Sequence, residues 1–346
     1  MRILYGVQTT GHGHLVRSTP IIRQLRGRGH QVDVLLSGPP PDAAWLERIG
    51  PPVSTRPGLT FAADGGRIHY LKTAWQARPL AFLRDVYRSP PDRPDLVVTD
   101  YEPITAWLAR RQGLRSVGIG HLYAFAWPGV PRARGNLVTR QVMDWFAPAS
   151  LPAGAHWNRF GAPILPPTVD PEVRLLARAT VEPDLVLVYL GFEPLARLVP
   201  LLRQFPGHRF HVYAKTPTGR EEGNVSIRPV SRPVFLADLA RCGGVITNAG
   251  FTLTSECLHL GIPVLVQPIH GQLEQESNGV ALEQLRLGTV ARGGLSRADV
   301  RRWLEHPAPA PQHYPDVTGA LVHWLDAGAR EPLQALSDRL WDRLPA

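Results

Sequence analysis

The segment Val245–Asn278 constrains the fold of this chain more than any other. Its sequence, VITNAGFTLTSECLHLGIPVLVQPIHGQLEQESN, predicts a strand, a tight turn at Asn248–Gly250, a helix over Phe251–Leu260 and a strand over Pro263–Gln267. The β-branched residues Val245–Thr247 suit a strand that is buried on both faces, as strands of parallel sheets are. A strand, helix and strand in such quick succession therefore predict a parallel α/β sheet.

The turn that opens this helix is the first candidate binding site. A helix start presents free backbone N–H groups and the positive end of the helix dipole, and both favour a phosphate group. Glu256, about one turn into the helix, places a carboxylate where it can accept both hydroxyls of a ribose. Glu274 and Gln275 add a carboxylate and an amide on the same rim, which suit the hydroxyls of a sugar. For the glycine turn alone, a plain βαβ turn is the alternative interpretation.

The stretch NAGFTLTSECLHLGIPVLVQPIHGQLEQESN resembles the donor-binding motif of GT-B glycosyltransferases of the UDP-glycosyltransferase superfamily. It looks most similar to the peptidoglycan N-acetylglucosaminyltransferase branch and to related uncharacterised prokaryotic glycosyltransferases. The resemblance implies that the donor diphosphate meets the turn, that Glu256 holds the ribose, and that Glu274 with Gln275 contacts the donor sugar. The turn residues concerned are Asn248, Ala249, Gly250, Phe251 and Thr252. The histidine of the plant-type motif is absent, so backbone donors carry more of the phosphate contact.

Length and composition agree with a folded, two-domain protein. The chain has 346 residues, and a single core tends to stop growing near 250–300 residues. Its formal net charge of +9 suits anionic donors, anionic lipid surfaces or nucleic acid, and the alternative is a general composition bias on solvated faces. Cys242 and Cys257 are expected to be buried thiols. The amino terminus has no signal pattern and the chain no long apolar run, so we expect a cytoplasmic protein, with a peripheral position at the inner membrane face as a further interpretation.

A strand at Arg2–Val7, a glycine loop at Gln8–His14, a helix up to about Arg28 and a strand at Val32–Leu36 predict the start of a doubly wound domain. Ser18–Pro20 either cap a helix that starts there or kink one that began near Leu15. His14 lies where ligands bind in such sheets, and a histidine there suits a general base. The alternatives are a loop histidine that bonds only backbone and, with His12, a metal pair lacking a third ligand.

The pattern GHGHL resembles the first loop of the same GT-B families, in which the histidine lies near the acceptor. The resemblance implies that His14 is the catalytic histidine and that Gly11, His12 and Gly13 line the acceptor side. LVVTD, at Leu96–Asp100, also resembles the superfamily, in which the aspartate orients the catalytic histidine. For Asp100 the alternative is a cap on the next helix.

Two further segments of the first half are candidates for the cleft. His121 follows a predicted strand at Ser116–Gly120 and is expected to face the cleft. Trp127–Arg140 mixes aromatic and cationic residues and is interpreted as an acceptor loop or a membrane-surface contact, with a plain surface loop as the alternative. Trp75–Arg88 is predicted to be a helix.

The second half begins after a proline-rich linker within Arg159–Asp184. A strand at Leu185–Leu190 leads to Gly191, whose backbone, by the resemblance, touches the diphosphate. Val230 and Ser231 precede a predicted helix at Val234–Arg241 and are expected to hold the base. The predicted domains are 1–165 for the acceptor, 166–330 for the nucleotide-sugar donor, and 331–346 for a terminal helix crossing back to the first domain.

The predicted fold class is α/β, with two Rossmann-like domains facing across a cleft, as in GT-B enzymes. The predicted function is metal-independent, inverting transfer of a hexose from a nucleoside-diphosphate sugar, expected to be UDP-linked, to an unidentified acceptor hydroxyl, with no cofactor. In this hypothesis His14, oriented by Asp100, removes the acceptor proton. The alternatives are a UDP-sugar 2-epimerase or hydrolase of the same fold, and a non-catalytic, arginine-rich polyanion binder. No nucleic-acid motif supports the last of these.

Overall fold

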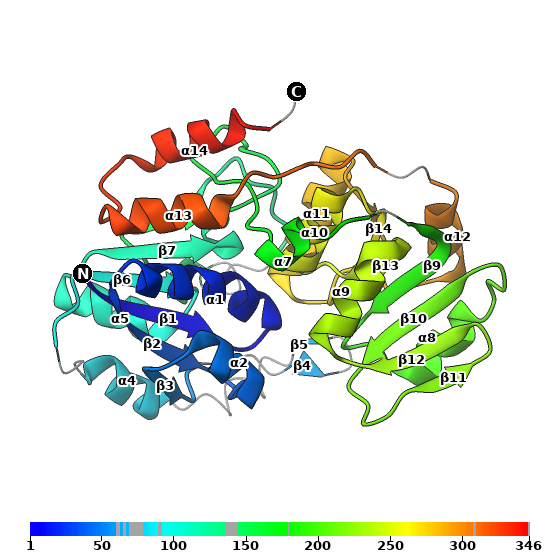
Figure 1. The fold of residues 1–346 in the computed structure, drawn as a ribbon, viewed down its shortest axis with the longest axis horizontal. Coiled ribbons are helices and arrows are strands. Elements are labelled where there is room, and N and C mark those ends of the chain that lie inside the picture. The colour runs from blue at the N-terminus through cyan, green and yellow to red at the C-terminus, as the bar shows by residue number, and fades with distance from the viewer. Residues whose placement is uncertain are drawn as a thin grey trace.

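The protein consists of two parallel α/β sheets that lie side by side (Figure 1). The computed structural model describes residues 1–59, 63–64, 67–68, 79–88, 92–135, 141, 144–178, 180–306 and 309–344. One buried apolar cluster contains residues of both sheets, so the two units share part of their core. The α/β fold class and its two-sheet arrangement are as predicted.

The first sheet has six parallel strands in the order β3-β2-β1-β6-β7-β8. The strands are β1 (Arg2–Gln8), β2 (Gln31–Ser37), β3 (Val53–Arg56), β6 (Leu96–Asp100), β7 (Ser116–Gly120) and β8 (Leu151–Gly154). The helices beside them are α1 (His12–Gly27), α2 (Ala43–Ile49), α4 (Pro79–Tyr87), α5 (Pro103–Gln112) and the 3₁₀ turn η1 (His121–Ala126). A short antiparallel pair, β4 (Ala63–Asp64) with β5 (Arg67–Ile68), forms a separate two-stranded sheet.

The second sheet has seven strands in the order β11-β12-β10-β9-β13-β14-β15, all parallel except β11. They are β9 (Glu182–Tyr189), β10 (Arg209–Ala214), β11 (Arg220–Glu222), β12 (Val225–Pro229), β13 (Cys242–Asn248), β14 (Val264–Gln267) and β15 (Thr289–Val290). The helices are α7 (Pro171–Arg174), α8 (Leu195–Leu202), α9 (Arg232–Arg241), α10 (Phe251–Leu260), α11 (Leu273–Leu285) and α12 (Arg297–Leu304).

Both sheets reverse their strand order at one point, and the candidate residues follow the strands at that point. In the first sheet the order reverses between β1 and β6. His14 follows β1, and Asp100 is the last residue of β6. In the second it reverses between β9 and β13, which precede Gly191 and the Asn248–Gly250 turn. Ligands of doubly wound sheets bind at such switch points, so the topology places one candidate half-site on each domain.

The last two helices return to the first domain (Figure 1). Helix α13 (Val317–Asp326) packs against α1, and His30 contacts Asp326 at 2.7 Å. Helix α14 (Leu333–Trp341) bonds to the carbonyl of Ile164 through Ser337 and Trp341, each at 2.7 Å. The chain therefore already touches the first domain at α13, ahead of the predicted domain boundary at residue 330.

Several predicted boundaries differ from those in the structure. The Gln8–His14 loop is wrong at its end, because α1 begins at His12 with Gly11 as its N-cap. Pro20 lies inside this helix, so Ser18 does not start it. The predicted helix at Trp75–Arg88 is α4, which starts at Pro79, and residues 75–78 lie outside the described residues. No helix in the described ranges is both long and apolar enough to cross a bilayer.

Candidate active site between the two domains

His14 and Asp100 meet at the switch point of the first sheet. His14 lies in the first turn of α1, and Asp100 is the last residue of β6 and fully buried. The His14 Nδ1 atom is 2.9 Å from Asp100 Oδ1. Glu102, and not Asp100, caps α5, since its carboxylate accepts from the backbone N–H groups of Ile104 and Thr105. The geometry therefore favours the histidine-orienting interpretation of Asp100 over the capping alternative.

The protonation state of this pair follows from its contacts. Burial raises the pKa of the Asp100 carboxyl, but the charge of Arg17 and the contact with His14 outweigh this effect and hold the pKa at about 2. An ionised carboxylate only accepts hydrogen bonds, so the proton of a neutral His14 ring sits on Nδ1. The Nε2 atom then carries the lone pair, and the ring keeps some exposure to solvent, at 19% of its side-chain surface.

The second half-site is the start of α10. Its N-cap is Gly250, no side chain caps the helix, and no acidic residue lies in its first turn. The first backbone N–H groups of the helix are thus available to an anion. At both Gly191 and Gly250, an added Cβ atom would meet nothing within 4 Å, so a ligand can approach the backbone there. The Asn248 side-chain amide donates a hydrogen bond to the Gln267 carbonyl at 3.0 Å.

The starts of α1 and α10 face each other across the two domains. A Cβ atom on Gly13 would lie 2.6 Å from the Thr252 hydroxyl, so only a glycine permits this approach. Because both helices present the positive ends of their dipoles, they concentrate positive potential at one place. The predicted acceptor-side residues Gly11 and Gly13 are therefore brought next to the predicted diphosphate site. The side chain of His12 lies outside the described atoms.

Glu256 is more deeply buried than a ribose ligand is expected to be. It is 1% exposed and its carboxylate lies 3.4 Å from Arg232, which also pairs with Asp170 at 2.7 Å. Burial raises the pKa of Glu256 to about 7, although Arg232 acts in the opposite direction. A ribose that reaches Glu256 must therefore compete with Arg232. Nothing in the sequence pattern indicated this arginine as a partner.

Glu274 and Gln275, which are adjacent in α11, have different environments. Burial and the charge of Asp100 raise the pKa of Glu274, while the charges of His14 and Arg17 lower it, so this carboxylate interacts electrostatically with the His14 half-site. Gln275 instead is buried, and its side-chain oxygen accepts from the backbone N–H of Ile269 at 3.1 Å. The structure thus brings Glu274 to the cleft and leaves the Gln275 oxygen engaged within its own loop.

His121 does not face an open cleft, contrary to the prediction. Its ring is 3% exposed and stacks on Phe251 with ring centroids 4.0 Å apart. Its Nε2 atom lies 2.5 Å from the Asn278 side-chain oxygen of the second domain. Phe251 also stacks on Trp157, so its side chain packs in this interdomain seam and only its backbone N–H is left for a donor. The prediction failed because exposure of a strand end depends on the opposite domain.

The remaining donor-side residues lie on the rim of the second sheet. Val230 is 46% exposed, and Ser231 is the N-cap of α9 without a side-chain hydrogen bond. Ala249 is buried, and its carbonyl accepts from the Asn278 amide at 2.8 Å. These positions leave Val230 and Ser231 free to contact a base, whereas Ala249 belongs to the seam.

The described part of the Trp127–Arg140 segment packs against the second domain. The Ala133 N–H donates to the Ser277 hydroxyl at 3.0 Å, and Arg132 lies over Phe125. Trp127 is only partly exposed. Ala133 is therefore tied to α11 of the second domain, and the acceptor-loop and membrane-surface interpretations both stay predictions. Residues 136–140 lie outside the described residues.

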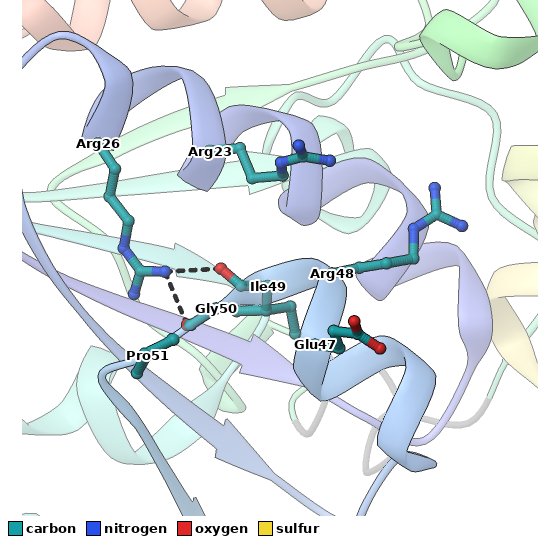
Figure 2. Close-up of a pocket in the computed structure, with 7 residues that line it drawn as sticks. All are labelled: Arg23, Arg26, Glu47, Arg48, Ile49, Gly50 and Pro51. Carbon is teal, nitrogen blue, oxygen red and sulfur yellow. Dashed lines mark hydrogen bonds between the residues drawn. The ribbon is translucent and has the colours of Figure 1, made fainter.

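A surface hollow of about 470 Å³ lies beside α2 and the second half of α1, away from this site (Figure 2). Arg26 points into it, but its guanidinium donates to the carbonyls of Ile49 and Gly50, as Figure 2 shows. Arg26 lies twelve residues after His14, which is roughly 18 Å along a helix. The hollow is therefore at the opposite end of α1 from the candidate site. Within the described ranges, no three His, Cys, Asp or Glu side chains group as metal ligands.

Comparison with known proteins identifies the fold and the family. No curated protein sequence matches this chain significantly. Among solved structures, MurG of Acinetobacter baumannii has a TM-score of 0.56 at 13% identity, covering 94% of this chain and 99% of that one. The glycosyltransferase SnogD from Streptomyces nogalater has a TM-score of 0.53 at 20% identity, with coverage of 98% and 96%. LpCGTa, solved in complex with UDP, has a TM-score of 0.57 at 17% identity, with coverage of 99% and 98%.

These likenesses agree with the two-domain architecture and confirm the predicted GT-B fold. The family model described as Glycosyl transferase family 1 matches residues 1–307. The chain therefore belongs to Glycosyl transferase family 1 and is a glycosyltransferase with the GT-B fold.

Proposed function

We propose that the protein transfers a hexose from a nucleoside-diphosphate sugar, with UDP as the expected nucleotide, to an acceptor hydroxyl, with inversion at the anomeric carbon. The observation that carries this proposal is the contact between the start of α1, which holds His14 beside Asp100, and the uncapped start of α10 on the other domain, made where Gly13 meets Thr252. A general base and a diphosphate site then lie on opposite sides of one cleft. This is the arrangement that a direct displacement requires.

In the proposed reaction, His14 Nε2 takes the proton of the acceptor hydroxyl. The acceptor oxygen attacks the anomeric carbon from the side opposite the diphosphate, and the bond from that carbon to the diphosphate oxygen breaks with its electron pair on the diphosphate. The backbone N–H groups at the start of α10 stabilise the charge that develops there. Because two helix starts supply positive potential, we propose that the departing diphosphate needs neither a metal ion nor a cofactor.

Residues of the second domain support the donor assignment. Glu256 offers a carboxylate to the ribose, Val230 and Ser231 lie where a base would rest, and Glu274 reaches toward His14 and the donor sugar. The expectation of uridine draws support from LpCGTa, a similar fold whose structure contains UDP. The site residues themselves carry no preference among hexoses.

Two alternatives differ from this proposal in reaction or in class. A UDP-sugar 2-epimerase or hydrolase of the same fold would consume the donor without an acceptor, while a transferase needs one. A non-catalytic polyanion binder would bind nucleic acid with steep salt dependence and ignore nucleotide sugars. Membership of a glycosyltransferase family argues against the second.

The test is donor consumption with a panel of acceptor hydroxyls, comparing wild type with His14→Ala. Loss of a general base is expected to lower kcat by about 10²- to 10⁴-fold, with UDP binding retained in calorimetry. The anomeric configuration of the product, read by NMR, should be opposite to that of the donor. Full activity of a folded His14→Ala protein, or retained configuration, would contradict the mechanism. Donor consumption at the same rate without an acceptor would support the hydrolase or epimerase.

We also infer a peripheral contact with anionic membranes, on the face formed by α4 and α5. Leu80, Leu83 and Tyr87 of α4 are 81%, 48% and 64% exposed. Arg111 lies over the Tyr87 ring at 4.7 Å, and the neighbouring Arg110 lies over Trp145, which is 52% exposed. Exposed apolar groups interleaved with arginines suit an anionic lipid surface.

Co-sedimentation with vesicles of phosphatidylglycerol and phosphatidylcholine checks this contact. The wild type is expected to bind anionic vesicles and to be released by salt, while Leu80→Ser with Leu83→Ser weakens binding several-fold. Leu46→Ser, on α2, removes a similarly apolar side chain elsewhere and serves as the control. Equal binding by all three proteins would refute the assignment of this face.

A further inference from the structure

Arg17 is a buried cation beside the proposed catalytic pair, and neither the sequence pattern nor the proposed reaction assigns it a role in setting the state of that pair. It is 8% exposed and lies one helical turn after His14 in α1. Its Nη2 atom is 2.5 Å from Asp100 Oδ1, and its Nε atom is 3.1 Å from Asp100 Oδ2. This is the bidentate geometry by which an arginine fixes a carboxylate in one orientation.

The backbone around Arg17 leaves room for the guanidinium. Gly120, at the end of β7, has φ of +114°, and a Cβ atom on it would lie 2.7 Å from Arg17 Nη2 and 3.1 Å from Asp100 Oδ1. The Ser18 hydroxyl donates to Asp100 Oδ2 at 2.7 Å, so both carboxylate oxygens of Asp100 have partners besides His14. A buried arginine held so closely requires its carboxylate partner, since an unpaired buried charge is strongly destabilising.

Arg17 also touches His14 directly. The Nη2 atom lies 3.2 Å from His14 Nδ1, the same atom that contacts Asp100. A guanidinium only donates and the Nδ1 atom of the neutral ring carries its proton toward Asp100, so this approach is a contact between two donors and not a hydrogen bond. A further proton on the ring would place two positive charges side by side, which Coulomb repulsion opposes.

Among the described residues, Asp100 from β6 and Arg17 from its own helix contact His14, and Glu274 from α11 interacts with it electrostatically. Without Arg17, two carboxylates would surround the imidazole and hold it as an imidazolium, which is unable to take a proton from an acceptor. With Arg17, one negative charge is balanced.

We propose that Arg17 is a positioning residue for the His14–Asp100 pair, which fixes the Asp100 carboxylate and keeps His14 from being trapped in its protonated form. The inference rests on the proposed function, since it concerns the same base. It predicts that removal of the Arg17 charge raises the pH at which His14 loses its ring proton.

The direct test is an NMR titration of the His14 imidazole, assigned by comparison with His14→Gln, in wild type and Arg17→Met. The His14 midpoint is expected to rise by about 1 to 2 pH units in Arg17→Met. Ser18→Ala removes a hydrogen bond to Asp100 but no charge and should leave the midpoint in place. Arg23→Met removes an exposed cation from the same helix and should also leave it unchanged. An unchanged midpoint in folded Arg17→Met would overturn the proposal.

Two further variants keep the inference testable if Arg17→Met does not fold. Arg17→Lys keeps the charge but cannot make the bidentate contact with Asp100. The His14 midpoint should therefore stay near that of wild type while kcat falls. Glu274→Gln removes a facing carboxylate, so its midpoint should move to lower pH, and a failure to move would contradict the charge balance.

Activity provides an independent readout. In Arg17→Met the acid limb of kcat/KM is expected to shift to higher pH by the same amount as the NMR midpoint, with Arg17→Lys restoring it. If His14→Ala keeps full activity, the proposed base is wrong, yet the NMR titration still decides the effect of Arg17. If the midpoint shifts while the acid limb does not, Arg17 does not act through His14 in catalysis.

Discussion

Three buried acidic residues differ in state because their neighbours differ. Asp100 is ionised because Arg17 and His14 bind it, and Asp238 is ionised because several donors surround it. The donors to Asp238 are His211, Tyr213, Arg228 and Arg241. Among the described residues, Glu256 has one hydrogen-bond partner, Arg232 at 3.4 Å, and burial raises its pKa to about 7. At the residue scale, close cationic donors decide whether a buried carboxylate keeps its charge.

The raised pKa of Glu256 predicts that donor binding depends on pH. An ionised carboxylate accepts both ribose hydroxyls, and below a pKa of about 7 the protonated form loses part of this capacity. Affinity for UDP-glucose, measured by calorimetry, should therefore increase about five- to tenfold between pH 6 and pH 8. Glu256→Gln should bind more weakly and show no such change.

The free energy of unfolding depends on pH in the opposite direction to donor affinity: it is expected to decrease as pH rises. Since the folded pKa is raised above the ordinary value of 4.5, the stability associated with a neutral Glu256 is present below pH 4.5 and lost as pH rises through about 7. Glu283→Gln removes an exposed acid of the same domain that pairs with Arg292 and not with Arg232, so it is the control and should retain the pH dependence of wild type. If UDP-glucose affinity changed with pH in the same way for Glu256→Gln and wild type, Glu256 would be excluded from the ribose site.

At the scale of elements, the site is built from two helix starts. Helices α1 and α10 each follow a central strand of their sheet, and both begin at a glycine N-cap without a side-chain cap. The positive ends of their dipoles come together because Gly13 allows contact with Thr252. The contact between the two helix starts therefore depends on the absence of a side-chain methyl group at Gly13.

Gly13→Ala tests this dependence. Its Cβ atom would lie 2.6 Å from the Thr252 hydroxyl, so we expect the two helix starts to separate, with a loss of about 1–3 kcal/mol in the free energy of unfolding and at least tenfold in kcat. Gly27→Ala, in open space at the other end of α1, should lose neither. The double variant Gly13→Ala with Thr252→Ala removes the hydroxyl and should recover part of both.

An unchanged kcat in Gly13→Ala would mean that the domains need not approach this closely during turnover. A loss of kcat that Thr252→Ala does not relieve would show that Gly13 acts through its backbone at the acceptor side. These outcomes separate the contact between helices from a local effect on α1.

At the scale of the whole molecule, the domains are joined by a buried seam and by returning helices. His121, Trp157 and Phe251 stack across the seam, and the Trp157 ring N–H donates to the Ser255 hydroxyl at 2.8 Å. Helices α13 and α14 add contacts to α1 and to the segment after β8. Fixed packing therefore joins the domains beside the two helix starts, whose backbone at Gly11 and Gly250 leaves space for a ligand.

Local patterns predicted much of the site. The strand–turn–helix units indicated His14 and the Gly250 turn as candidates, because glycines, strand ends and helix starts are properties of short sequences, and the family resemblance added Asp100. Arg17 was missed, although its spacing of three residues from His14 places both on one helix face, which is a usable signal. Arg232 was missed as a partner of Glu256 because the two belong to different helices.

The sequence by itself determined the two α/β sheets, the helix starts at their switch points and the chemistry of the candidate base. These follow from apolar periodicity and from turn residues, which act over a few positions. Only the tertiary structure decided that His121 and Phe251 form a seam, that Arg232 pairs with Glu256, and that α13 packs on α1. Contacts between distant segments depend on the relative placement of the two domains, which no local pattern encodes.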